Sequence, residues 1–130
     1  MTQALVLDAS AMVTLLIGGS AATTVARRIE GTEVHVPAHF DAEVLSALGR
    51  LQRAGALSIA QVADRLDMLA AAPFERHAVA PLLASAWDRR GNVRLVDALY
   101  VALASELGAP LITLDRGLDS ACEQAELLQA

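Results

Sequence analysis

Four acidic residues occupy positions where the chain is expected to be ordered or buried. Asp8 directly follows the apolar run "ALVL", and Asp115 directly follows the apolar run "LITL". Asp97 lies inside "LVDALYVALASELG", which is otherwise mostly apolar, and Glu43 lies in the amphipathic segment 38–54. Because an unpaired charge is costly to bury, something must offset the charge of Asp97.

A divalent cation is the partner that four carboxylates could share. Carboxylates brought together raise one another's pKa unless a cation offsets their charge. Oxygen ligands without accompanying Cys or His favour Mg²⁺ or Mn²⁺ over zinc. Such an ion, together with the amides at a helix N-terminus, would offset the cost of burying Asp97. The pattern therefore predicts one metal site, formed by Asp8, Glu43, Asp97 and Asp115.

Each of these acids also has a purely structural interpretation. An Asp at a strand end often forms a turn, Asp97 could be a helix N-cap, and Glu43 alone could be a charge at a helix edge. Asp41 and Asp119 are predicted to be surface helix charges, although Asp119 could join the acidic site as an accessory residue. The prediction of a metal site therefore depends on the four acids occurring together.

The histidines and the cysteine do not indicate a second kind of site. His35 and His39 have i, i+4 spacing, but Pro37 between them argues against one continuous helical face, so no zinc site is expected. His77 is expected to pack or to form a hydrogen bond. Cys122 is the only cysteine, which excludes an internal disulfide and favours a small buried apolar side chain.

Local signals predict the elements that must position the acids. Ser10, Ser20 and Ser58 are candidate N-caps, Pro37 and Pro81 suit first helical turns, and several glycines mark helix ends. Apolar periodicity separates short strands from amphipathic helices. The expected strands are 4–8, 32–37, 74–80 and 109–115, with a possible edge strand at 126–128. The expected helices are 10–18, 20–30, 38–54, 58–72, 81–91 and a helix that contains Asp97 and ends at Gly108.

This alternation of strands and helices predicts an α/β fold. A parallel sheet of four or five strands should lie between helices on both faces, because each parallel connection crosses over the sheet. Ligands of such sheets bind beyond the carboxyl ends of the strands. Asp8 and Asp115 should reach that edge directly, and the helices that begin there should bring Glu43 and Asp97.

Length and composition agree with one domain over residues 1–130. A chain of 130 residues buries about two-thirds of the surface that its unfolded form exposes, which leaves no room for a second core. Hydrophobic residues make up 55% of the chain but aromatic residues only 3%, so the core must consist mainly of Ala, Leu and Val. No apolar run is long enough to span a membrane and no basic leader is evident, so we expect a cytoplasmic protein.

Charge composition excludes several phosphate-handling classes. All ten basic residues are arginine, so a P-loop, a phospho-receiver domain and an aspartate-nucleophile phosphatase are excluded, because each relies on a lysine. The net charge of −5 argues against a simple basic nucleic-acid clamp unless the acids hold metal ions. Arginine must then bind any phosphate backbone, and the candidates are Arg116 beside Asp115 and, more weakly, Arg89, Arg90 and Arg94.

Three segments stand out in the sequence: "VLDASAMVTLL", "VPAHFDAEVLSALGRL" and "GNVRLVDALYVALASELGAPLITLDRGL". In this order they resemble the signature regions of PIN-domain ribonucleases, specifically the VapC-type toxins of prokaryotic toxin–antitoxin pairs. The resemblance spans nearly the whole chain and implies a PIN-like three-layer α/β/α sandwich. Val96 stands at a position that is often aromatic in the family, and Arg94 at one that is often small and polar.

The resemblance also implies roles for individual residues. It places the metal-binding acids at Asp8, Glu43, Asp97 and Asp115, and supporting hydroxyls at Ser10 and Thr113. We expect the three aspartates to hold the principal ion, while Glu43 orients or deprotonates the attacking water. The implied reaction is cleavage of single-stranded or loop RNA that leaves a 3′ hydroxyl and a 5′ phosphate.

The implied partners are RNA, a second copy of the chain and a small VapB-type antitoxin that inhibits the enzyme as part of a type II toxin–antitoxin pair. Two other functions remain open at this point. The chain could be a binding module of the same fold without catalysis, or a metal-dependent phosphohydrolase that acts on small phosphate esters. A metal titration and an assay with both substrate classes separate these three possibilities.

Overall fold

The computed structural model describes residues 2–129. In this range the strands are β1 (Ala4–Leu7), β2 (Glu33–Pro37), β3 (Glu75–His77), β4 (Leu111–Thr113) and β5 (Ala125–Leu127). The helices are α1 (Ala9–Ile17), α2 (Ser20–Ile29), α3 (Phe40–Arg53), α4 (Ile59–Ala71), α5 (Leu83–Asp88), α6 (Leu95–Leu107) and α7 (Arg116–Ala121), with a 3₁₀ turn at Ala80–Leu82. None of these helices is both long and apolar enough to cross a bilayer.

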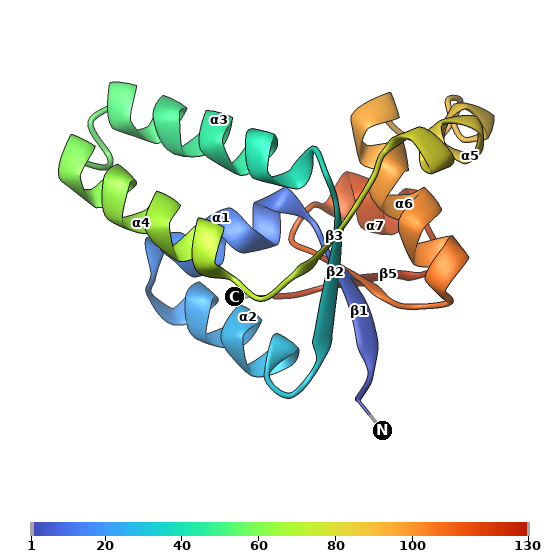
Figure 1. Cartoon of the computed structure of the whole chain (residues 1–130), viewed down its shortest axis with the longest axis horizontal. Helices are drawn as coiled ribbons and strands as arrows, with labels where there is room; N and C mark the ends of the chain where they lie inside the picture. The colour runs from blue at the N-terminus through green and yellow to red at the C-terminus, as the bar shows by residue number, and fades with distance from the viewer. Residues whose placement is uncertain (1, 130) are drawn as a thin grey trace.

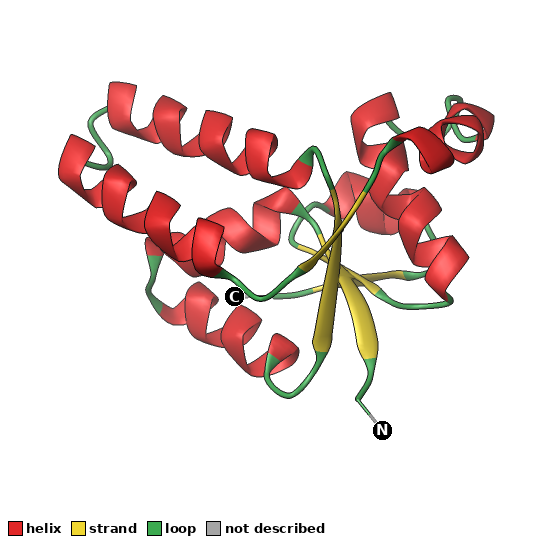
Figure 2. Ribbon diagram, in the orientation of Figure 1, coloured by secondary structure: helices red, strands yellow, loops and turns green. Residues whose placement is uncertain are grey.

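The five strands form one parallel sheet in the order β3-β2-β1-β4-β5, which confirms the predicted α/β fold. Helices α1 to α4 lie on one side of the sheet, and α5 to α7 lie on the other (Figure 1). The sheet therefore forms the middle layer of three (Figure 2).

Strand β1 is the point where the direction of the chain across the sheet reverses. The chain runs outward from β1 to β2 and β3, then returns across the sheet to β4 on the other side of β1. Val6 of β1 is paired with both His35 of β2 and Leu111 of β4. A crevice forms beyond the carboxyl ends of the strands at such a reversal, and Asp8 and Asp115 follow the two strands that border it.

The core is built largely from small and aliphatic side chains, as the composition predicts. Leu5, Val6 and Leu7 of β1 are completely buried, which is typical of a central strand covered on both faces. Helix α6 is buried along seven consecutive residues from Ala98 to Ala104 because it packs directly over β1, β2 and β4. Cys122 is also buried, as predicted.

The ends of several elements differ from the prediction. Asp8, not Ser10, caps α1, because its carboxylate accepts a hydrogen bond from the backbone amide of Ala11. Gly19, not Ser20, precedes α2, and no side chain caps that helix. Pro37 is the last residue of β2 and not part of a first helical turn, because α3 begins only at Phe40.

The region between α4 and α6 is less regular than predicted. The predicted strand 74–80 is reduced to Glu75–His77, because the chain turns into a 3₁₀ turn around Pro81. The predicted helix 81–91 is regular only from Leu83 to Asp88. The edge strand is present, one residue earlier than predicted.

Candidate active site

A cleft of about 350 Å³ lies at the carboxyl edge of the sheet, and all four predicted acids line it. Each acid stands at the N-terminal end of a different helix. Asp8 caps α1, Asp115 caps α7, Asp97 is in the first turn of α6, and Glu43 is in the first turn of α3. Helix N-termini carry partial positive charge, so this arrangement favours ionised carboxylates around the cleft.

Asp8 is the most buried of the four acids and is held on both oxygens. Its Oδ1 accepts hydrogen bonds from the Ser10 hydroxyl at 2.7 Å and the Ala11 amide at 2.9 Å, and its Oδ2 accepts one from the Thr113 hydroxyl. The sequence-based prediction placed Ser10 and Thr113 beside the acidic site, and the structure places both on Asp8. Together they fix the rotamer of this carboxylate.

Burial raises the pKa of Asp8, because the charged form loses contact with water. The hydrogen bonds from Thr113, Ala11 and Ser10 oppose this rise, and the negative charge of Asp115 adds to it. A nearby cation would favour the ionised form of Asp8, and the ionised carboxylate would in turn favour binding of that cation.

Asp115 presents one oxygen to the protein and leaves the other available. Its Oδ1 accepts hydrogen bonds from the backbone amides of Gly117 at 2.8 Å and Leu118 at 3.2 Å. Its Oδ2 makes no hydrogen bond with residues 2–129. Thr113 connects this residue to Asp8, because its hydroxyl accepts a bond from the Asp115 amide and donates one to Asp8.

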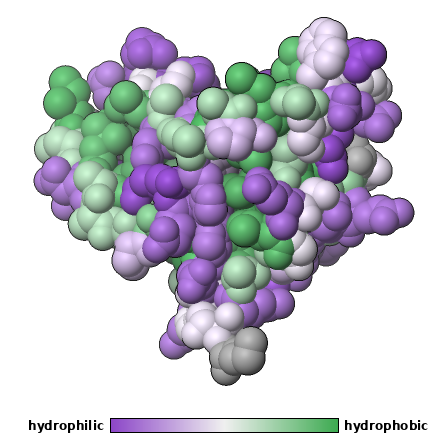
Figure 3. Space-filling model, turned by 45° about the vertical axis from the view of Figure 1, so that its right-hand side comes forward, coloured by the Kyte–Doolittle hydropathy of each residue, from purple (hydrophilic) through white to green (hydrophobic). Residues whose placement is uncertain are grey.

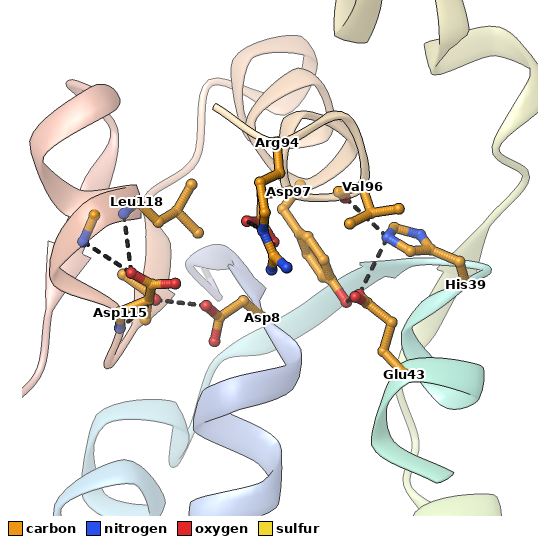
Figure 4. A network of polar contacts seen from close by, with 11 residues as sticks. Asp8, His39, Glu43, Arg94, Val96, Asp97, Asp115 and Leu118 are labelled. Carbon is orange, nitrogen blue, oxygen red and sulfur yellow. Dashed lines mark hydrogen bonds and ion pairs between the residues drawn. The ribbon is translucent and has the colours of Figure 1, made fainter. Parts of the chain in front are cut away.

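Glu43 is oriented by two side chains that the sequence analysis did not assign to the site. The hydroxyl of Tyr100 donates to Glu43 Oε1 at 2.6 Å, and His39 Nε2 lies 3.2 Å from the same oxygen. His39 Nε2 also lies 3.0 Å from the carbonyl oxygen of Val96 (Figure 4). Burial alone would raise the pKa of Glu43, but the hydrogen bonds from His39 and Tyr100 outweigh it and lower the pKa.

Asp97 is compensated by an arginine three residues earlier. Arg94 forms a bidentate pair with it, from Nε to Oδ2 at 2.9 Å and from Nη2 to Oδ1 at 3.3 Å. The N-cap of α6 is Arg94, so the alternative that Asp97 itself caps this helix is wrong. The positive charge of Arg94, at the same end of α6, thus offsets the partly buried charge of Asp97.

The four candidate arginines for RNA occupy different places. Only Arg94 lines the cleft. Arg116 is exposed next to Asp115 but does not line the cleft. Arg89 donates a hydrogen bond to Ser85. Arg90 lies over the ring of Trp87, with its guanidinium carbon 4.7 Å from the ring centroid.

Arg50 lines the cleft although the sequence analysis did not select it. It lies seven residues after Glu43 on α3, which is two helical turns, and Ala47 between them also lines the cleft. Two further residues of the site that the sequence analysis did not assign are likewise separated from a predicted acid by whole helical turns. His39 and Tyr100 lie one turn from Glu43 and Asp97, respectively, so helical spacing was the signal that could have found all three.

The acids that were predicted to lie at the surface lie outside the cleft. Asp41 pairs with Arg76 in a bidentate contact, and Asp119 is part of α7 without lining the cleft. The predicted separation of the histidines is also correct. His35 lies between His77 at 2.7 Å and Glu33 at 2.6 Å, whereas His39 belongs to the Glu43 side of the cleft.

The donor set of the cleft fits a hard divalent cation in chemistry. Among the described residues, the polar side chains that line it are carboxylates, hydroxyls and arginines, and neither Cys nor His lines it. In residues 2–129, no three His, Cys, Asp or Glu side chains are already close enough to enclose one ion. Asp97 is turned toward Arg94 (Figure 4), so holding an ion would require a change in the orientation of Asp97.

The chain is similar to known proteins of one family. The model of the PIN domain family matches residues 5–124. Ribonuclease VapC3 of Mycobacterium tuberculosis is 52% identical over 124 residues, which cover 95% of this chain and 90% of the relative. Ribonuclease VapC12 of the same organism is 39% identical over 85% of this chain and 86% of the relative.

A solved structure shares the fold at low sequence identity. The structure of VapBC2 from Rickettsia felis bound to a DNA fragment from its promoter contains a chain that superposes with a TM-score of 0.71. The match covers 98% of this chain and all of that chain, at 13% identity. The arrangement of strands and helices around the cleft is therefore shared far beyond recognisable sequence similarity.

Proposed function

Because this chain belongs to the PIN domain family, we propose that it is a VapC-type endoribonuclease that hydrolyses RNA phosphodiester bonds with a divalent metal ion. The observation that carries the proposal is the meeting of Asp8, Glu43, Asp97 and Asp115 in one cleft. These acids come from four helix ends spread over more than a hundred residues of sequence. Turn formation or surface charge does not explain why all four face the same space.

Mg²⁺ or Mn²⁺, when bound, would lower the pKa of a water and offset the charge that develops on the phosphate. Asp8, Asp97 and Asp115 would hold the ion. Ser10 and Thr113 keep the Asp8 carboxylate in one orientation, which limits the reorganisation needed on binding.

Glu43 is suited to orient the attacking water or to accept its proton. Its Oε1 is held by Tyr100 and His39, and its Oε2 makes no hydrogen bond within residues 2–129. The fixed oxygen sets the direction of the free one. Attack of this water on the phosphorus breaks the bond to the 3′ oxygen, which takes up a proton and leaves as a hydroxyl, while the phosphate stays on the 5′ side.

RNA cleavage with Mg²⁺, with chelator and with single variants tests the proposal. Asp8→Asn and Asp97→Asn should each lower the cleavage rate by at least about 100-fold, because each removes a charge from the metal site. Asp119→Asn is the matched control, since Asp119 is an acid near the cleft that does not line it. Full activity of both variants would refute the assignment. Turnover of a nitrophenyl phosphate without RNA cleavage would favour the small-ester alternative.

We further propose that the enzyme acts in the cytoplasm, where its RNA substrate is found. We also propose that a VapB-type antitoxin binds the apolar groove between α3 and α4. The groove has a volume of about 410 Å³ and is lined by Leu45, Leu66, Leu69 and Ala70, with the Asp41–Arg76 pair at its edge. Figure 3 shows hydrophobic side chains at the surface in separate patches between hydrophilic ones. An apolar groove with a charged edge suits an amphipathic helix.

A second apolar surface is available for association of two copies of the chain. Leu83, Trp87, Leu95 and Val96 are each about half exposed and lie around a depression between α5 and α6. Large exposed apolar side chains gathered in one place are typical of an interface. We propose that this patch forms the homodimer contact.

A further inference from the structure

The pair formed by Arg94 and Asp97 is asymmetric in its exposure. The Arg94 side chain is 74% exposed, whereas that of Asp97 is only 17% exposed. Both side-chain oxygens of Asp97 are engaged by the guanidinium. The guanidinium spans both oxygens and so occupies the space in front of the carboxylate where a metal ion would bind, which means that the two cations compete for the same ligand.

Arg94 also faces the other acids of the cleft. Its pKa is raised by the hydrogen bond and the charge of Asp97, and further by the charges of Glu43 and Asp115. Its side chain extends into the cleft from the N-terminus of α6 (Figure 4). The guanidinium therefore supplies positive charge to the same group of carboxylates that would hold a metal ion.

Arg94 stands between two cavities. One is the acidic cleft, and the other has a volume of about 280 Å³ and is lined by Asn92, Val93, Gly117 and Leu118. Arg94, Asp97 and Asp115 line both cavities, so the side chain of Arg94 belongs to the partition between them.

We propose that Arg94 is an internal counterion of the metal-free enzyme and a phosphate-binding residue of the metal-loaded enzyme. Without metal, Arg94 neutralises Asp97; when an ion takes Asp97, the guanidinium turns to the RNA backbone at the rim of the cleft. This inference rests on the proposed function, since it needs both a metal site and an RNA substrate.

The physical chemistry of the pair supports such an exchange. Because the Arg94 side chain is largely exposed, the pair contributes little stability, so a divalent ion with several carboxylate ligands can displace the arginine. The released guanidinium keeps its charge and stays attached beside the reacting phosphate. Its planar donors match phosphate oxygens in pairs, which makes arginine a suitable residue for this second role.

The test is to compare Arg94→Gln with the unaltered chain in two separate measurements. Mn²⁺ affinity is measured without RNA, from the electron paramagnetic resonance signal of unbound Mn²⁺. We expect Arg94→Gln to bind Mn²⁺ about fivefold more tightly, because the competing cation is gone. In RNA cleavage at saturating Mn²⁺, the same variant should show a KM about tenfold higher, because a charged contact to phosphate is lost.

Two further variants make the result specific to the position of Arg94. Arg27→Gln removes the same charge from an exposed site on α2, far from the cleft, and should change both quantities by less than about twofold. Arg94→Lys keeps the charge but loses the fork that grips both oxygens of Asp97, so it should give intermediate values. Circular dichroism confirms that each variant is folded.

The opposite signs of the two effects distinguish the proposal from a merely structural role. Equal or weaker Mn²⁺ binding by Arg94→Gln, or an unchanged KM, would overturn it. If the unaltered chain binds Mn²⁺ and cleaves RNA while Arg94→Gln binds no more tightly, only this inference fails. If Arg94→Gln binds Mn²⁺ more tightly but neither protein cleaves RNA, the counterion role stands and the ribonuclease proposal fails.

Discussion

The hydroxyl of Tyr100 is one of the two hydrogen-bond donors that lower the pKa of Glu43, and it acts from within the core. Tyr100 is almost completely buried. The loss of water around its hydroxyl, together with the hydrogen bond to Glu43, raises the pKa of that hydroxyl. Tyr100 therefore acts only as a donor at any physiological pH. A buried donor with one carboxylate acceptor restricts Glu43 to a single orientation.

Tyr100→Phe is expected to destabilise the protein by about 1–2 kcal/mol, because a hydrogen bond to a charged acceptor is lost. The pKa of Glu43 is lowered in the fold, so its contribution to stability is present above the unfolded pKa and is lost as pH falls through the folded pKa. Without Tyr100 this loss should begin at a higher pH. Urea unfolding across acidic pH measures the change, and Thr24→Val, which removes an exposed hydroxyl, is the control.

Asp8 has the opposite pH dependence, because burial raises its pKa in the fold. Its stabilising contribution is present below the unfolded pKa and is lost as pH rises through the folded pKa. At neutral pH and in chelator, Asp8→Asn should therefore be at least as stable as the unaltered chain, although it does not cleave RNA.

Urea unfolding at pH 7.5 and pH 4 in chelator tests this expectation, with Asp119→Asn as the control. The advantage of Asp8→Asn should shrink at the lower pH, where Asp8 itself becomes protonated. A large loss of stability at pH 7.5 would instead mean that the carboxylate of Asp8 is needed for folding.

At the scale of residues, the sequence predicted which acids meet and that Ser10 and Thr113 support them, but not which donors hold Glu43. Strand ends and helix starts were sufficient to place Asp8, Glu43, Asp97 and Asp115 at one edge of the sheet. The donors Tyr100 and His39 were missed because their types suit packing as well as hydrogen bonding. His39 reaches Glu43 from one turn earlier in the chain, whereas Tyr100 reaches the same oxygen only because α6 packs beside the start of α3.

At the scale of elements, two serines with the same expected role behave differently. Ser58 caps α4 in a reciprocal capping box with Gln61. Ser20 was also a predicted cap, but α2 already begins at this residue after Gly19, whose φ of 93° turns the chain into the helix. Positive φ at Gly18 and Gly19 was not visible from residue type alone.

This contrast gives a matched pair of substitutions. Ser58→Ala should lower the free energy of unfolding by about 1 kcal/mol, because the first turn of α4 loses its cap. Ser20→Ala should change it by less than about 0.5 kcal/mol, because no capping bond is lost. Thermal or urea unfolding measures both, and equal effects of the two substitutions would contradict the assigned caps.

The order of the elements was predictable, whereas several of their ends were not. Apolar runs and amphipathic periods predicted four strands and a possible fifth at the edge, and the parallel arrangement follows from the helices between them. The region 74–91 was overextended, since its apolar residues suit either a strand or a buried turn. The structure of this region depends on the contacts of α5 with α6, and such contacts cannot be predicted from the periodicity of a short segment.

At the scale of the whole molecule, a substitution in the α3–α4 groove tests whether the inhibitor binds there. Leu45→Asp places a charge in the groove and should weaken antitoxin binding by at least about tenfold while RNA cleavage is retained. Ile59→Asp is the control, because Ile59 is 75% exposed on α4 but does not line the groove. Calorimetric titration with the cognate antitoxin measures both. Unchanged binding of Leu45→Asp would place the inhibitor elsewhere.

The pairing of β1 with β4 has a consequence for how the enzyme is made. On one side β1 pairs with β2, which follows soon after it in the sequence, but on the other side Val6 and Leu7 pair with Leu111 and Ile112, so the sheet cannot close around β1 until β4 has been made. A chain that stops before β4 also lacks Asp115, so it cannot assemble the cleft that the four acids line.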